Sequence, residues 1–326
     1  MLTSAATSRT ARWSRSLTAV AAALVLSTAC SAAGGKARNT ASGQTTAAAS
    51  AGHDSATRGD AEFNRQFQHE MADVNGVRMH YVTGGTGEPL VLLHGWPQSW
   101  YAWRGIMPAL AERYTVYALD LPGLGDSVGT PASYDKATLA RYVHGLLADK
   151  LGLRKINLIA HDHGAGVGFQ YAAQFPNEVV KYAHLDYPLP GPALSANNFR
   201  QLSWHMSFHS QGGFGGPGAK APFTAQQIDE FARTYQRPQV LTGGFELYRT
   251  LDQDERDNVA AKPITMPTML LTAEGTLDFT RSTVQPLMSN ITRAVEVPKS
   301  GHWLPEENPE FVTAELVKFF GSGAGR

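Results

Sequence analysis

The hydrophobic positions between residues 69 and 188 switch repeatedly between short apolar runs and stretches with helical spacing. The runs HEMADV and VRMHYVTGG flank Asn75-Gly76, which predicts a β-hairpin. Further apolar runs are typical of strands buried on both faces of a parallel sheet, and they cover residues 89–95, 114–123, 155–161 and 179–188. Helical spacing at 135–151 and 164–175 predicts helices between these strands, so we expect a sheet with helices on both faces.

The alternation breaks between residues 189 and 262, a stretch rich in Gly, Pro and aromatic residues. Its segments TAQQIDEFARTY and FELYRTLDQDERDNVA have helical character, so we interpret the stretch as an inserted, mostly helical cap. Strand patterns return in MPTMLLTAE and AVEVPKSGHW, and an amphipathic helix, PEFVTAELVKFF, follows them. The sequence thus predicts an α/β core of residues 62–188 and 263–322, interrupted by a cap at 189–262.

Residues 1–30 have the features of an export signal. Three arginines precede SLTAVAAALVLSTA, an apolar run of signal-peptide length that is too short to span a bilayer comfortably. Cys30 directly follows this run. It is either a chance cysteine of a cleaved signal or the lipid-bearing first residue of a lipoprotein, although Ser27 stands where lipoprotein signals usually have Leu. We therefore expect an exported protein, secreted or attached to a membrane through lipidated Cys30.

Composition restricts the partners and the source of stability. Residues 31–61 are rich in Ala, Gly, Ser and Thr and predict a disordered tether. Lys plus Arg and Asp plus Glu both number 28, so the formal net charge is zero and nothing indicates a nucleic-acid partner. Because the chain has a single cysteine, no disulfide forms within it and the core must supply the stability. The oligomeric state stays open, with a homodimer as one expectation.

The segment INLIAHDHGAG (156–166) carries the main chemical signal. It runs from a predicted strand through a tight turn into a helix, with Asp162 at the corner. Ala160-His161-Asp162-His163-Gly164 follows the small-x-nucleophile-x-small pattern of the nucleophile turn in α/β hydrolases, where small residues fit a cramped and strained backbone. The alternative is a structural Asp162 that caps the following helix.

A carboxylate at this corner restricts the reaction. Its reference pKa is about 4, so it is ionised at neutral pH without a base. Attack on an ester would give a reactive anhydride, whereas attack on a saturated carbon that bears a leaving group gives a stable alkyl ester. Asp162 therefore predicts an epoxide or an alkyl halide as the electrophile and water as the second substrate, with no cofactor and no metal.

Other parts of a hydrolase site follow in chain order. HGWP (94–97) ends the third predicted strand, and the backbone N–H groups of Trp96 and His163 are the predicted oxyanion donors. GHW (301–303) ends the last strand, and His302 is the predicted base because this fold orders its residues nucleophile, acid, histidine. Spacing leaves two positions open for the acid, which are Asp186 after the sixth strand and Glu274 or Asp278 after the seventh.

With these residues in place, the chain resembles the epoxide hydrolases of the α/β-hydrolase family over about residues 63–320. The resemblance rests on the segments HGWPQSWYAWR, DLPGLGDS, AHDHG, LDYPLP, LSWHMSFH, FELYRTL and GHWLPEE. It implies an α/β-hydrolase fold, with a mostly parallel eight-stranded sheet, helices on both faces and an inserted helical cap. It also implies an enzyme that opens an epoxide to a vicinal diol.

The resemblance implies roles for the matching core positions. Asp162 corresponds to the nucleophile, His302 to the base, and Asp186 to the acid that orients the base. More familiar epoxide hydrolases place this acid after the seventh strand, so Glu274 and Asp278 stay as alternatives.

Two cap residues, His205 and Tyr248, correspond to the pair that holds the epoxide oxygen. More familiar epoxide hydrolases use two cap tyrosines instead. Core packing is the alternative for Tyr248, because it shares a helical face with Phe245 and Leu251.

Two other functions stay open. Fluoroacetate dehalogenases share much of this layout but carry arginines where this chain has His163 and Gly166. Haloalkane dehalogenases commonly have a Trp directly after the nucleophile. A haloalkane or haloacid dehalogenase with the same nucleophile is therefore the alternative, and a surface-tethered binding protein with weak or no activity is an alternative of another class.

Overall fold

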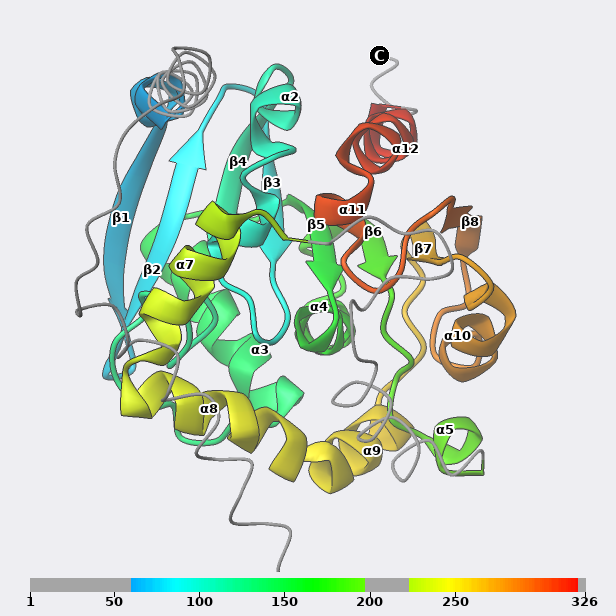
Figure 1. The fold of residues 1–326 in the computed structure, drawn as a ribbon. Coiled ribbons are helices and arrows are strands. Elements are labelled where there is room, and N and C mark those ends of the chain that lie inside the picture. Colours follow the sequence, from blue (N-terminus) through cyan, green and yellow to red (C-terminus); the bar gives the residue numbers. More distant parts are fainter. Residues whose placement is uncertain (1–59, 197–222, 322–326) are drawn as a thin grey trace, which may run out of the picture. The chain divides into compact units, whose positions relative to one another are not determined.

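The computed structural model describes residues 60–196 and 223–321, and a sheet of eight strands runs through this part of the chain (Figure 1). The strands follow one another in the order β1-β2-β4-β3-β5-β6-β7-β8. Their bounds are β1 (Phe67–Val74), β2 (Val77–Gly84), β3 (Glu88–Leu93), β4 (Tyr114–Leu119), β5 (Ile156–His161), β6 (Val179–Leu185), β7 (Thr268–Ala273) and β8 (Ile291–Val297).

The first two strands form the predicted hairpin. β1 pairs with β2 in antiparallel register, and Val74 lies opposite Val77 across the turn. Asn75 and Gly76 both have positive φ, 47° and 83°, as a two-residue type I′ turn requires. β2 also pairs antiparallel with β4, and every later pairing, from β4 through to β8, is parallel.

Alternate residues of the central strands pack on opposite faces of the sheet. In β3, Val91 and Leu93 join one hydrophobic cluster with the helices α3 (Lys136–His144) and α4 (His163–Gln174). Leu90 and Leu92 join the other cluster, with α2 (Met107–Ala111) and α12 (Pro309–Gly321). Burial on both faces explains why these strands are continuous apolar runs, and the predicted fold class is confirmed.

The helices differ from the prediction in detail. The expected helix 135–151 changes at Gly145 into a π-helical segment, η2 (Gly145–Lys150). The expected helix 245–260 divides at Thr250, whose hydroxyl donates to the carbonyls of Glu246 and Leu247 in competition with the helical backbone. Several short elements were not predicted, among them η1 (Trp100–Trp103), α2, α10 (Leu277–Val284) and α11 (Leu304–Glu307).

The described part of the cap lies between β6 and β7 in the chain. It contains α5 (Pro192–Ala196), α7 (Ala225–Tyr235), α8 (Pro238–Arg249) and α9 (Leu251–Ala260). α7 begins with a capping box between Thr224 and Gln227. The strands β5 and β6 point toward α8 and α9 (Figure 1), so the cap faces the carboxyl edge of the sheet.

The first 59 residues lie outside the described part of the chain, as does His205. The predicted signal peptide with Cys30 therefore has no structural description, and of the predicted tether only residues 60 and 61 are described, at the start of a helix. Within residues 60–196 and 223–321, none of the helices combines the length and the apolar character that crossing a membrane needs.

Candidate active site

Asp162 stands at the corner between β5 and α4 with φ 51° and ψ −133°, a conformation that is strained for any residue except glycine. The surroundings leave no room for larger neighbours. A Cβ at Gly164 would strike the backbone of Leu93 and His94, and a Cβ at Gly95 would strike the side chain of Asp162. The small residues of the turn are therefore needed so that the carboxylate can reach the edge of the sheet.

Asp162 is 8% exposed as a residue, and its carboxylate is hydrogen-bonded on both oxygens. Its Oδ1 accepts the backbone N–H of Trp96 at 3.0 Å, and its Oδ2 lies 3.2 Å from Nε2 of His302. The side chain makes no capping hydrogen bond to α4, although Asp162 occupies the N-cap position. The alternative of a structural cap is therefore not supported.

His302 bridges two carboxylates. Its Nδ1 lies 2.7 Å from Oδ2 of Asp186, on the opposite side of the ring from Asp162. The other oxygen of Asp186 accepts the N–H of Ala273 at 2.9 Å and the hydroxyl of Thr276 at 3.3 Å. Asp186 is held so that one oxygen is left for the imidazole.

The two alternative acids lie elsewhere. Glu274 is exposed and accepts the backbone N–H of Lys299 at 3.1 Å. Asp278 is exposed in the first turn of α10. Of the three candidates, Asp186 is the one that the structure brings to His302.

The charges of the central pair follow from these contacts. Burial by itself would raise the pKa of Asp162, but the adjacent His163 and the hydrogen bond from His302 hold it well below its usual range. Burial by itself would lower the pKa of His302, but its hydrogen bonds to Asp162 and Asp186 outweigh this and raise the pKa to about 10. At neutral pH the site therefore contains an imidazolium between two carboxylates.

The two histidines that flank the nucleophile are uncharged. Burial lowers the pKa of His161 to about 4 and that of His163 to about 3. The N–H of Trp96 already binds the carboxylate, as a predicted oxyanion donor would. Among the described hydrogen bonds the backbone N–H of His163 makes none to this carboxylate, so its oxyanion role stays a prediction.

The loop of His302 is held by groups that the sequence patterns did not indicate. The carboxylate of Glu307 accepts the N–H of Gly301 at 2.7 Å and that of Trp303 at 2.9 Å, so it binds both neighbours of the histidine. Nε2 of His161 donates to the carbonyl of His302 at 2.7 Å. The segment GHWLPEE was visible in the sequence, but nothing in it indicated that its glutamates face back toward the histidine.

A buried chain of polar groups continues behind His161. The amide of Gln98 lies between Nδ1 of His161, at 3.1 Å, and the carboxyl of Glu306. Burial raises the pKa of Glu306 to about 8, so this carboxyl is protonated at neutral pH. Neutral His161 uses its one N–H on the carbonyl of His302, so its Nδ1 must accept. The amide orientation that fits these protonation states has the Gln98 N–H toward His161 and its oxygen accepting from Glu306.

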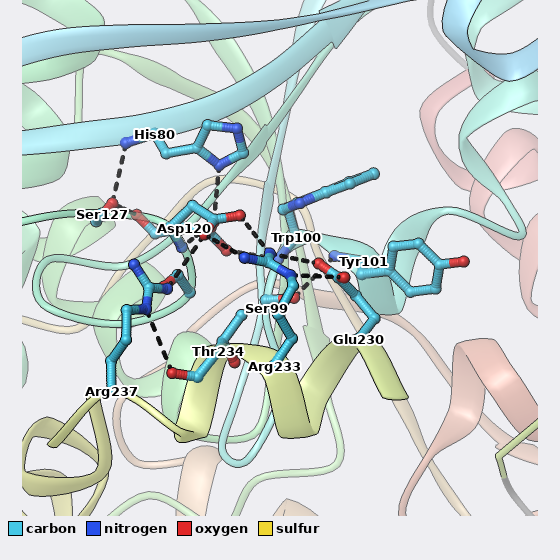
Figure 2. Close-up of polar contacts among 12 residues, drawn as sticks. His80, Ser99, Trp100, Tyr101, Asp120, Ser127, Glu230, Arg233, Thr234 and Arg237 are labelled. Atoms are coloured by element: carbon cyan, nitrogen blue, oxygen red, sulfur yellow. Dashed lines mark hydrogen bonds and ion pairs between the residues drawn. The ribbon is translucent and has the colours of Figure 1, made fainter. Parts of the chain in front are cut away.

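Asp120, which follows β4, is the centre of a second buried cluster (Figure 2). Its Oδ1 accepts the N–H of Trp100, and its Oδ2 accepts from the ring of His80 and the N–H of Asp126, each at 2.7 Å. The hydroxyl of Ser127 donates to the Asp120 carbonyl at 2.9 Å. These bonds hold together the loops after β3 and β4, and the first of these loops carries Trp96.

His80, Asp120 and Asp126 bring potential metal-ligating atoms within 4.8 Å of one another. Both carboxylates are already engaged, however. The two oxygens of Asp120 bind the donors described above, and the carboxylate of Asp126 pairs with Arg233 at 2.6 Å and with Arg237 at 3.1 Å. A cation would have to displace these donors, so we assign the cluster a structural role that joins α7 to the core.

Tyr248 reaches the site from α8. Its ring lies edge-on to His163 with the ring centres 4.5 Å apart, and edge-on to Trp96 at 5.5 Å. Burial and the nearby Asp162 raise its pKa, so the hydroxyl keeps its proton. Tyr248 itself is 36% exposed, so it is not a core residue. The partner predicted for Tyr248, His205, lies outside the described residues.

Fold and site together define an α/β hydrolase with a buried carboxylate at the strand-to-helix turn, and the comparisons agree on the fold. A family model described as the alpha/beta hydrolase fold matches residues 88–208. The soluble epoxide hydrolase of Corynebacterium sp. (strain C12) is 34% identical over 286 residues, which are 78% of this chain and 98% of that protein. The chain therefore belongs to the epoxide hydrolases of the α/β-hydrolase family.

Two further comparisons show how widely the layout is shared. The solved structure of epoxide hydrolase CorEH without ligand has a TM-score of 0.67 at 34% identity, and the match covers 79% of this chain and 99% of that one. The fluoroacetate dehalogenase of Burkholderia sp. is 28% identical over 294 residues, which are 79% of this chain and 95% of that protein. Similar chains thus carry the names of epoxide hydrolases and of a dehalogenase.

We predict that Glu306→Gln changes how stability depends on pH. The unfolded chain releases the Glu306 proton near pH 4.5, whereas the folded protein holds it up to about pH 8. Between these values the wild-type protein loses stability as the pH rises, because its folded state must keep a proton that its unfolded state has released. Relative to wild type, Glu306→Gln therefore gains up to about 1.4 kcal/mol per pH unit in this window.

Urea unfolding at pH 5, 6, 7 and 8 measures this difference. Glu310→Gln is the matched control, because Glu310 is an exposed glutamate of α12. Parallel stability curves for wild type and Glu306→Gln would contradict a protonated Glu306.

Proposed function

We propose that the protein hydrolyses epoxides to vicinal diols through an ester on Asp162. One observation carries the proposal: an ionised, nearly buried carboxylate stands on a strained turn and is bonded to a histidine that a second carboxylate orients. Such a group has no need of a base for its own attack, and its ester needs one for release. Membership of the epoxide hydrolases supports the same reaction.

In the first half-reaction the hydroxyl of Tyr248 donates a hydrogen bond to the epoxide oxygen. Asp162 attacks one ring carbon from the side opposite to this oxygen. The carbon–oxygen bond of the ring breaks and the new ester bond forms. The released alkoxide takes up the proton of the His302 imidazolium, which the neutral ester no longer holds, so His302 is left as a free base. We propose His205 as the second group that holds this oxygen, on the basis of the resemblance alone.

In the second half-reaction His302 removes a proton from a water molecule, which attacks the carboxyl carbon of the ester. The tetrahedral oxyanion is stabilised by the N–H of Trp96, which already binds this carboxylate, and by that of His163. Losing one such donor typically raises a barrier by roughly 3 kcal/mol. Breakdown of this intermediate releases the diol and regenerates Asp162.

A dehalogenase with the same nucleophile is the second candidate, because a fluoroacetate dehalogenase is among the relatives. His163 is uncharged at neutral pH, since burial lowers its pKa to about 3, so it offers no cation for the carboxylate of a haloacid. An epoxide oxygen, in contrast, leaves as an alkoxide, to which the protonated hydroxyl of Tyr248 can donate a hydrogen bond. A panel of epoxides and alkyl halides, assayed for diol and for released halide, separates the two functions.

We predict that His302→Ala traps the ester. Alkylation needs only the ionised Asp162, whereas release of the ester needs the base. Incubation with an epoxide that the wild-type protein hydrolyses should add the mass of one epoxide to the intact variant. The double variant Asp162→Asn/His302→Ala is the control and should gain no mass. A mass gain in both variants would assign the attack to another residue.

We also predict the path of solvent oxygen. In a single turnover in water enriched in oxygen-18, the label should enter the Asp162 carboxylate, because water attacks the carboxyl carbon and not the substrate. Mass spectrometry of the tryptic peptide 156–181 detects it, and the diol of that first turnover should carry no label. Label in the diol alone would show direct attack by water and would exclude the ester.

We propose, from the sequence of residues 1–30, that the protein is exported and anchored by a lipid on Cys30, with secretion of a cleaved chain as the alternative. Expression of the full chain in bacteria fed labelled palmitate should give a labelled protein in the membrane fraction. Cys30→Ser should remove the label. Unlabelled wild-type protein with a shortened N-terminus would indicate simple secretion.

A further inference from the structure

Lys136 is a fully buried lysine at the boundary between core and cap. It is the first residue of α3, and only 1% of it is exposed. Lysine is rarely buried to this degree unless its charge is paired. Its Nζ lies 2.8 Å from Oδ2 of Asp254 in α9, and its backbone N–H donates to Oδ1 of the same carboxylate at 2.8 Å.

The same ammonium group also binds α8. It donates to the carbonyl of Leu247 at 2.6 Å, in the last turn of that helix. Carbonyls of a last turn lack partners within the helix, and the negative end of the helix dipole lies there, so a cation is well placed. Leu247 directly precedes Tyr248. The lysine thus binds the backbone of the residue next to the proposed donor.

The stem of Lys136 also contacts the nucleophile helix. A Cβ built on Gly166 of α4 would lie 2.9 Å from Cγ of Lys136, so the glycine allows the close approach. Gly166 is in the first turn of α4, where its N–H approaches the carbonyl of Asp162 at 3.4 Å. Lys136 therefore touches both the helix that begins at the nucleophile and the helix that carries Tyr248.

Stabilisation of the folded protein does not by itself explain why Lys136 and Asp254 are charged residues. A buried ion pair typically gives no more stability than well-packed apolar side chains of similar volume. The hydrogen bond from the ammonium group to one carbonyl, however, fixes the direction and the distance between Lys136 and α8 more closely than apolar packing would. Displacement of a reacting group by about 1 Å can lower a rate on the order of 100-fold.

We propose that Lys136, paired with Asp254, is a positioning residue that holds the Tyr248 hydroxyl in place over Asp162 for ring opening. This inference rests on the proposed function. Lys136 itself touches no substrate and acts through the backbone of α8. Its effect is on ester formation, which uses Tyr248.

The test replaces the pair by apolar side chains, in Lys136→Met/Asp254→Leu, so that neither charge is left unpaired. The variant should fold with a somewhat lower thermal midpoint than wild type, because the Lys136 N–H and the Leu247 carbonyl lose their hydrogen-bond partners while no charge is left unpaired. Ester formation is then followed by intact mass in the His302→Ala background, with the epoxide that wild type hydrolyses fastest. The replacement should slow ester formation about 10- to 100-fold.

A cycle with Tyr248→Phe separates positioning from a general structural effect. If the pair acts through the hydroxyl, the same double replacement should change ester formation by less than about twofold in a Tyr248→Phe background. Lys155→Met is the matched control. Lys155 directly precedes β5, whose other end leads to Asp162, and its ammonium group donates to the carbonyl of Asn177. Its replacement should leave the rate of ester formation unchanged.

Two outcomes would overturn the inference. One is an unchanged rate of ester formation in Lys136→Met/Asp254→Leu, and the other is an equal loss with and without the Tyr248 hydroxyl. If that variant does not fold, Lys136→Gln/Asp254→Asn takes its place in the same cycle. Failure of the proposed function is distinct, because His302→Ala alone would then form no ester.

Discussion

The imidazolium of His302, shared by two buried carboxylates, governs the chemistry of the site. In the resting protein Asp162 and Asp186 both bind it, which holds its pKa near 10 and keeps the nucleophile ionised. Alkylation converts Asp162 into a neutral ester, so one of the charges that retain the proton disappears. The pKa of His302 must then fall. The base becomes available only after the nucleophile has reacted, which is the order that a two-step hydrolysis needs.

This pairing depends on backbone strain at the edge of the sheet. Both carboxylates stand on residues with positive φ, 51° for Asp162 and 42° for Asp186, and such a conformation costs on the order of 1–3 kcal/mol at a residue other than glycine. Adjacent parallel strands, β5 and β6, bring them to the same edge, and packing on both sheet faces offsets the strain. The carboxylates can therefore converge on one ring although 24 positions separate them in the chain.

Local sequence patterns predicted the hairpin at Asn75-Gly76, the buried strands and the corner at Asp162, because each depends on neighbouring residues. They could not choose among the acids, since Asp186 meets His302 only through the sheet. They also missed contacts between distant segments. Glu306 binds Gln98, which is 208 positions away, and a lysine at the start of a helix has the pattern of a surface residue when it is read alone.

The proposed half-reactions divide between core and cap, and polar contacts join the two beside their apolar packing. The carboxylates and His302 belong to the core, so ester hydrolysis needs nothing from the cap beyond exclusion of bulk water. The proposed ring opening uses Tyr248, which the cap supplies, together with Asp162 of the core, and a displacement of about 1 Å between such groups can lower a rate on the order of 100-fold. Apolar packing tolerates small shifts, whereas a hydrogen bond between charged or carbonyl groups loses strength steeply with angle. The bonds of Lys136 to α8 and of Arg233 to Asp126 therefore lie where rigidity matters most for the first step.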